Sequence, residues 1–142
     1  MTTTPATGVI FVQAATMLAI HLADHALPEP ASLRVNTSGL HSDVMAQLRS
    51  TAVPTVARDL LAWADTVPTV TVQAWRVLAG DRVHLSIAST LTGPTGAVEL
   101  DVFGAVDYDP ARFADLTAGD RCKVPLRQLR AWAALDVAGG RR

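Results

Sequence analysis

Two histidines four residues apart are the first pair in this chain whose spacing suits metal binding. On a helix, His21 and His25 would point the same way, as a zinc site requires. The signature of zinc proteases is missing, because Leu22 and Ala23 stand where its glutamate and the next residue would be. Histidines near a helix C-terminus also interact favourably with the helix dipole. We therefore predict no metal and no other cofactor.

Four acidic residues lie close together in the second half of the chain. Glu99 and Asp101 alternate along a run that reads as a strand, which places them about 6–7 Å apart on one face. Paired carboxylates do acid–base work only where burial separates their pKa values. Asp107 and Asp109 are better explained as turn and helix-cap residues.

No catalytic motif is complete. His84 and Asp101 could form an acid–base pair on neighbouring strands, but no motif places a serine or cysteine to finish a triad. The single cysteine, Cys122, excludes an intrachain disulfide and favours a reducing, cytoplasmic setting. The glycines lack the spacing of a phosphate-binding loop. We assign no catalytic residue, and the prediction leans against an enzyme.

Three consecutive strands must position these side chains. Apolar and polar residues alternate over three runs between Val70 and Val106, and a period of two indicates strands with one buried face. Turn residues separate the runs, which is typical of antiparallel neighbours. The inward sets are Val70, Val72 and Ala74, then Val83, Leu85 and Ile87, then Val98, Leu100 and Val102.

The opposite face of this sheet mixes aromatic rings with charged groups of both signs. One interpretation is a solvated face whose cross-strand ion pairs each contribute only ~0.2–1 kcal/mol. The other is a binding face, because exposed Trp, Phe and Arg are favoured at interfaces. With Gln47 and Ser86 beside them, the predicted binding residues are Arg34, Arg49, Gln73, Trp75, His84, Glu99, Asp101 and Phe103.

The first helix is predicted from about Gly8 to Ala26 and ends at a proline-containing segment. Its first four turns have almost no polar side, and one sheet can cover only one side of a helix, so the other side needs a neighbouring helix or a second subunit. We therefore expect a homodimer whose interface includes Val9, Phe11, Val12 and Met17. The segment has no preceding basic residue and is too short to cross a bilayer, so we predict neither a signal peptide nor a membrane span.

The remaining pattern completes an α+β fold. We predict an antiparallel sheet of about five strands, with the helices packed on one face. The chain order is helix, two strands, helix, three strands, short helix, helix, in one domain over residues 1–142 with flexible ends at 1–6 and 138–142. The other predicted elements are strands Ser32–Asn36 and Asp43–Arg49, a helix from Pro54 to Asp65, a short helix opening at Pro110, a brief strand Arg121–Val124 and a final helix from Pro125.

Composition narrows the class of protein. Hydrophobic residues make up 49% and charged residues 18%, against roughly 25% charged in an average soluble domain. So few charges suggest either an efficient core or a surface covered by another subunit. The net charge of −1 argues against general nucleic-acid binding. A basic C-terminal segment with Arg127 and Arg130 keeps nucleic-acid binding as a second alternative.

The sequence matches no family pattern that we can name. It favours a small, soluble, cytoplasmic interaction or regulatory module that is homodimeric and has a possible protein partner. The first alternative is a small-molecule-binding protein or enzyme with a pocket on the curved sheet face, lined by His84, Asp101, Trp75 and Tyr108. Concavity separates the two, because a ligand pocket needs a hollow of several hundred Å3 with convergent polar groups.

Overall fold

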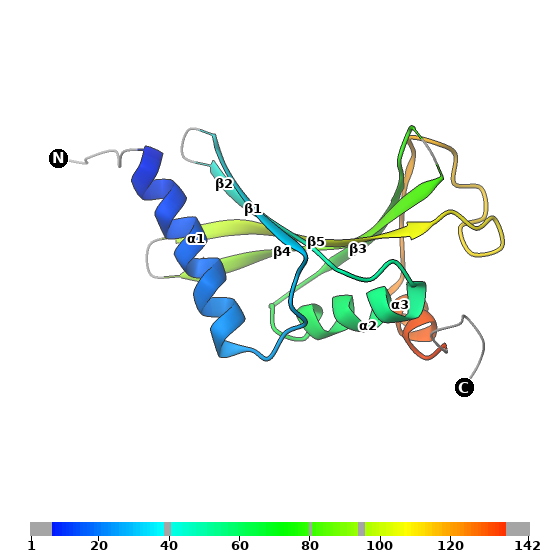
Figure 1. The fold of residues 1–142 in the computed structure, drawn as a ribbon, viewed down its shortest axis with the longest axis horizontal. Helices are drawn as coiled ribbons and strands as arrows, with labels where there is room; N and C mark the ends of the chain where they lie inside the picture. Colours follow the sequence, from blue (N-terminus) through cyan, green and yellow to red (C-terminus); the bar gives the residue numbers. More distant parts are fainter. Residues whose placement is uncertain (1–6, 39–40, 80, 94–95, 136–142) are drawn as a thin grey trace.

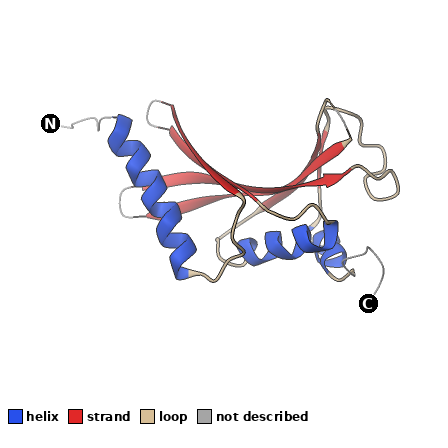
Figure 2. Ribbon diagram, in the orientation of Figure 1, coloured by secondary structure: helices blue, strands red, loops and turns tan. Residues whose placement is uncertain are grey.

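The computed structural model describes residues 7–38, 41–79, 81–93 and 96–135. These residues form a six-stranded mixed sheet with three helices on one side of it (Figures 1 and 2). The predicted flexible ends, 1–6 and 138–142, lie outside the described residues. The elements are α1 (Thr7–Asp24), β1 (Ser32–Ser38), β2 (His41–Gln47), α2 (Val53–Ala64), β3 (Thr71–Arg76), β4 (Arg82–Gly93), β5 (Gly96–Asp107), β6 (Arg121–Lys123) and α3 (Leu126–Ala133).

The strand order is β1-β2-β5-β4-β3-β6, and it differs from the predicted sheet in two respects. One pair, β2 with β5, is parallel, whereas all the others are antiparallel. The parallel pair arises because α2 carries the chain from β2 to β3. The chain then runs through β4 to β5, which pairs with the edge of β2 that β1 leaves free. The sixth strand, β6, is the brief strand that the sequence predicted, added to the outer edge of β3.

The hairpin predicted between Ser32 and Arg49 is present. β1 and β2 pair antiparallel over seven positions, with Ser32 opposite Gln47 and Ser38 opposite His41. Residues 39 and 40 of the connection lie outside the described part of the chain.

The short helix predicted at Pro110 is a set of turns instead. Asp109 accepts hydrogen bonds from Ala111 N at its side chain (3.0 Å) and from Phe113 N at its carbonyl (2.8 Å), which makes one helical turn. The turn cannot continue, because Asp115 has a φ of 62°, in the left-handed region. Of the two final helices in the predicted order, the first is therefore replaced by turns, whereas the second is present as α3 after β6.

Apolar side chains of the strands face the helices and form the core. α2 contributes Leu60 and Trp63, both fully buried. A Cβ on Gly104 would lie 2.6 Å from Val56 Cγ1, so the missing side chain lets α2 approach the middle of β5 closely. α3 packs beside α2 through Leu129 and Trp132.

The sheet is bent, and the helices cover only its convex side. In Figure 1, β1 and β2 rise at one end and β3 at the other, while α2 and α3 lie below β4 and β5. α1 packs against β1, β2 and β4. The face turned away from the helices is therefore concave. None of the helices in the described segments is long and apolar enough to cross a membrane.

Candidate ligand-binding face

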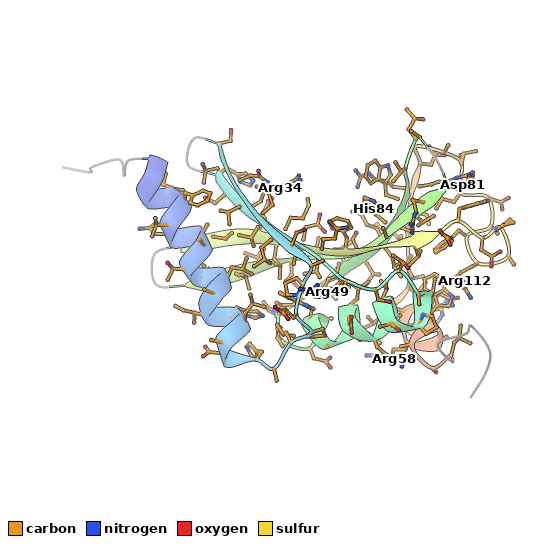
Figure 3. The ribbon with its side chains drawn as sticks, viewed as in Figure 1. Arg34, Arg49, Arg58, Asp81, His84 and Arg112 are labelled. Atoms are coloured by element: carbon orange, nitrogen blue, oxygen red, sulfur yellow. The ribbon has the colours of Figure 1, made fainter. Side chains whose placement is uncertain are left out.

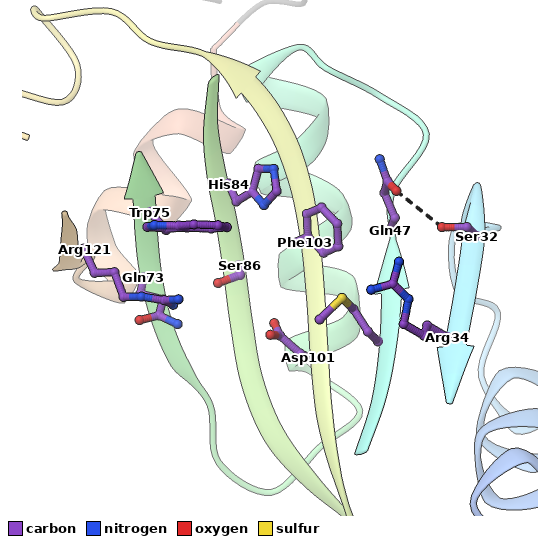
Figure 4. Close-up of a pocket in the computed structure, with 11 residues that line it drawn as sticks. Ser32, Arg34, Gln47, Gln73, Trp75, His84, Ser86, Asp101, Phe103 and Arg121 are labelled. Carbon is purple, nitrogen blue, oxygen red and sulfur yellow. Dashed lines mark hydrogen bonds between the residues drawn. The ribbon is translucent and has the colours of Figure 1, made fainter. Parts of the chain in front are cut away.

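The open face of the sheet contains a hollow of about 360 Å3, which we call the concave hollow (Figure 4). Five strands and the edge strand β6 contribute to its lining. The side chains around it are Ser32, Arg34, Met45, Gln47, Gln73, Trp75, His84, Ser86, Asp101, Phe103 and Arg121.

Three rings form one side of the hollow, the aromatic wall of Trp75, His84 and Phe103. His84 stacks on Phe103 with ring centroids 4.6 Å apart, and it meets Trp75 edge to face at 5.2 Å. The strand register produces this group, because Trp75 lies directly opposite His84 while Phe103 pairs with Ser86, one step along the same face. Aromatic pairs in these geometries stabilise each other beyond their buried area.

Three polar side chains form the polar floor next to the wall: Gln73, Ser86 and Asp101. Gln73 and Ser86 are opposite one another on β3 and β4. Asp101 lies diagonally across from Ser86, about 7–8 Å away by sheet geometry. Within the described residues, none of these three side chains hydrogen-bonds to another protein group.

Asp101 is the most unusual group in the floor. Its Oδ1 atom is buried and has no hydrogen-bond partner among the described residues. Burial raises the pKa of Asp101 above its ordinary value, the Arg121 guanidinium opposes this by lowering that pKa, and Asp43 raises it further. A buried acceptor without a donor costs folding free energy. Such a group is commonly part of a functional site.

Two arginines stand at opposite edges of the hollow. Arg34 is on β1 and Arg121 on β6, and both are exposed. The Arg121 guanidinium lies 5.0 Å from the centre of the Trp75 ring. Neither arginine has a carboxylate within 4.0 Å in the described part of the chain. Both can therefore meet a ligand or a partner.

The acid–base pair that the sequence allowed between His84 and Asp101 is not formed. His84 lies opposite Ala105, four residues from Asp101, which separates the two by about 13 Å along the strand. Phe103 lies between them on the same face. Burial lowers the pKa of His84, so its ring favours the neutral form.

Six of the eight predicted binding residues line the hollow, and Arg49 and Glu99 do not. Figure 3 shows Arg34 and His84 on the open side of the sheet but Arg49 on the side of the helices. Arg49 follows the end of β2, so strand alternation no longer sets its direction, and it lies 4.0 Å from Glu29. Glu99 is exposed near the start of β5 and pairs with His41 at 3.3 Å.

Two further residues differ from the expected lining. Tyr108 lies outside the hollow, because its ring packs under the Arg76 guanidinium at 3.7 Å.

Arg121 was missed, although the sequence predicted its strand, because nothing in the sequence showed which edge that strand would join. Once β6 pairs with β3, Arg121 lies opposite Trp75.

The outer side of α1 is apolar and uncovered by the described residues. Ala14 and Leu18 are buried against the sheet, whereas Phe11 and Val12 are exposed. Of the four predicted interface residues, Met17 instead turns toward β4, where a Cβ on Gly93 would be 3.2 Å from its methyl group. Val9 belongs to α1, but its side chain is outside the described residues.

His21 and His25 lie together at the end of α1, with ring centroids 4.6 Å apart. His21 Nε2 is 2.8 Å from Thr66 Oγ1, which in turn donates to the Trp63 carbonyl. Burial and His25 lower the pKa of His21, while Asp24 raises it. Among described residues, no three His, Cys, Asp or Glu side chains gather into a metal-binding group. His21 has a structural contact here, joining α1 to α2.

Arg127 and Arg130 lie on the exposed side of α3, opposite the buried Leu129 and Trp132. This arrangement is ordinary for an amphipathic surface helix.

Comparisons with protein-family models, with curated proteins and with solved structures found no match to this chain. The function must therefore be inferred from the geometry of the concave face.

Proposed function

We propose that this protein binds a small organic molecule in the concave hollow. The main support for this proposal is that the aromatic wall and the polar floor lie side by side in a hollow of about 360 Å3. Small-molecule sites have volumes of roughly 300–1,000 Å3 and combine apolar walls with a few convergent polar groups. The concave hollow has all three features.

The unpaired oxygen of Asp101 also supports ligand binding. A sheet face that only met solvent would gain nothing from burying Asp101 Oδ1 without a donor. A ligand that supplies the donor would recover that cost on binding. The proposal is one of binding rather than catalysis, because in the described hollow no hydrogen bond joins a nucleophile to a base.

The three tryptophans give a direct test. Trp75 lies in the hollow, whereas Trp63 is fully buried and Trp132 is 7% exposed in the core. Isotope-labelled protein would be screened by NMR against small ring compounds of negative, neutral and positive charge. The Trp75 indole N–H signal would be assigned with Trp75→Phe.

We expect a subset of these compounds to shift the Trp75 indole signal and to leave the Trp63 signal in place. If no compound of any charge shifts the Trp75 signal, or if hits shift only Trp132, the proposed function is wrong.

A second candidate function is self-association through α1. Phe11, Val12 and Ile20 are about half exposed on its outer side, and Leu33 of β1 is 47% exposed. This outer side carries no charged residue between Ile10 and Ala23, so a second copy of the same face could cover it without burying a charge. It agrees with the predicted homodimer and is compatible with a ligand in the concave hollow.

A further inference from the structure

We infer that the ligand is a planar nitrogen-containing ring compound whose N–H groups donate hydrogen bonds to Asp101. This inference rests on the proposed function, because it names the class of molecule that the concave hollow accepts. It follows from the neighbours of Asp101, from the orientation of Trp75 and from the positions of the two arginines.

The sheet register leaves Asp101 without a donor. Its direct neighbours across the sheet are Met45 on β2 and Ala88 on β4, and neither side chain can donate a hydrogen bond. The buried Oδ1 atom is therefore an acceptor that the described residues do not satisfy. A ligand N–H is the group that fits it, since hydrogen bonds to a carboxylate are stronger than those between neutral groups.

The aromatic wall indicates that the donor belongs to a flat molecule. Figure 4 shows the Trp75 ring edge-on, with Gln73, Ser86 and Asp101 all on one side of its plane. A ring lying over the polar floor would therefore approach the face of Trp75 on the side where the Arg121 guanidinium lies, 5.0 Å from the ring centre. Met45 adds an apolar, adaptable side chain near Asp101. Stacking on a tryptophan favours a planar ring over a flexible chain.

The rest of the polar floor favours a heterocycle. The Gln73 amide and the Ser86 hydroxyl each both donate and accept hydrogen bonds. Beside the acceptor Asp101, they suit a ring edge with both N–H groups and acceptor atoms. A plain hydrocarbon would leave all three polar groups unpaired at a cost in free energy.

The arginines determine which way the ligand faces. Arg34 and Arg121 are exposed at the edges of the hollow, so an acidic substituent can contact them from outside the floor. A carboxylate placed on the floor itself would meet the Asp101 side chain and be repelled. The N–H edge of the ligand therefore faces Asp101, and any acidic group faces the solvent side.

Two probes of equal ring size test this inference. 2-Aminoquinoline presents N–H donors on its ring edge, and 2-naphthoate presents a carboxylate. Each would be titrated to millimolar concentration into wild-type protein, Asp101→Asn and the control Asp107→Asn, following the Trp75 indole signal. Asp107 lies on the same strand but is exposed outside the hollow, paired with Arg82.

We expect 2-aminoquinoline to bind more tightly than 2-naphthoate and to shift the Trp75 signal. Asp101→Asn should weaken it on the order of tenfold, because the neutral amide oxygen accepts a weaker hydrogen bond than the carboxylate, while Asp107→Asn leaves it unchanged.

Tighter binding of 2-naphthoate that depends on Arg121 and not on Asp101 would overturn the inferred ligand class and leave the proposed function standing. Binding of 2-aminoquinoline that is equal in wild-type protein and Asp101→Asn would also overturn the inference. If neither probe shifts the Trp75 signal, the inference is overturned, and the broader screen for compounds of any charge decides whether the proposed function falls with it.

Discussion

The ring of His84 lies stacked on that of Phe103, with centroids 4.6 Å apart and planes inclined by 23°. The two side chains come from neighbouring strands, β4 and β5, and Trp75 closes the other side of His84 from β3. These contacts join three residues from three strands into one aromatic wall. They also bury the His84 imidazole, so that its charged form is poorly solvated.

His84 should therefore titrate below the ordinary histidine pKa of 6.5, because burial disfavours its charged form. Trp75→Ala would expose the ring and return its pKa toward 6.5. NMR titration of the His84 ring protons checks both values. A His84 pKa that stays the same in wild-type protein and Trp75→Ala would show that the wall does not bury the imidazole.

Lowered histidine pKa values also set the sign of a pH effect on stability. His84 and His21 both resist protonation in the folded state. Their contribution to the free energy of unfolding is complete above pH 6.5. It is lost as pH falls below 6.5, because the unfolded chain then binds more protons than the folded protein does.

Asp101→Asn should stabilise the protein at pH 7. The raised pKa of Asp101 means that the folded state holds its proton more strongly, so stability decreases as pH rises through the window above 3.8. Asparagine removes the ionisation and its cost, which we place at about 1 kcal/mol because the residue is partly exposed. Urea unfolding at pH 7 should show this gain, and the gain should shrink toward pH 4. A destabilised Asp101→Asn would mean that the carboxylate has a folding partner.

Gly104→Ala should destabilise the fold by about 1–3 kcal/mol, the usual cost of overpacking a core. The added methyl group would lie 2.6 Å from Val56 Cγ1, so the Val56 side chain or α2 itself must shift away from β5. Val56→Ala should remove most of this penalty in a double-mutant cycle. Ala105→Ser, on the open face of the same strand, is the control. Additive effects of Gly104→Ala and Val56→Ala would contradict the close approach.

Self-association through α1 makes a separate prediction. If a second copy covers its outer side, light scattering should give the mass of a dimer, and Phe11→Glu should reduce it to a monomer. Leu78→Glu, also at an exposed apolar residue, should leave the dimer intact. A wild-type monomer at every concentration would reject this interface without affecting the concave hollow.

Much of the sheet could be predicted from local pattern. The alternation from Val70 to Val106 predicts which side chains share a face, and that parity placed Trp75, His84, Asp101 and Phe103 together. The parity rule fails where a strand ends, which is why Arg49 lies on the wrong side. Alternation also does not show how far along a strand each residue lies. It therefore did not reveal that Asp101 is four residues away from Ala105, the residue that pairs with His84.

The remaining differences depend on contacts between distant segments. The parallel pairing of β2 with β5 and the pairing of β6 with β3 both join segments far apart in the chain, which no local pattern encodes. Arg121 enters the site only through the pairing of β6 with β3.

Filling the concave hollow with a side chain should abolish ligand binding there. Ser86 is 6% exposed in the middle of the floor, and Ser86→Phe would place a ring in the space where the ligand is proposed to bind. Compounds that raise the melting temperature of the wild-type protein would be measured again on this variant, after its fold has been verified by circular dichroism. We expect their effect to disappear in Ser86→Phe, whatever their charge. Equal stabilisation of both proteins would show that the molecules bind elsewhere and that the concave hollow is not their binding site.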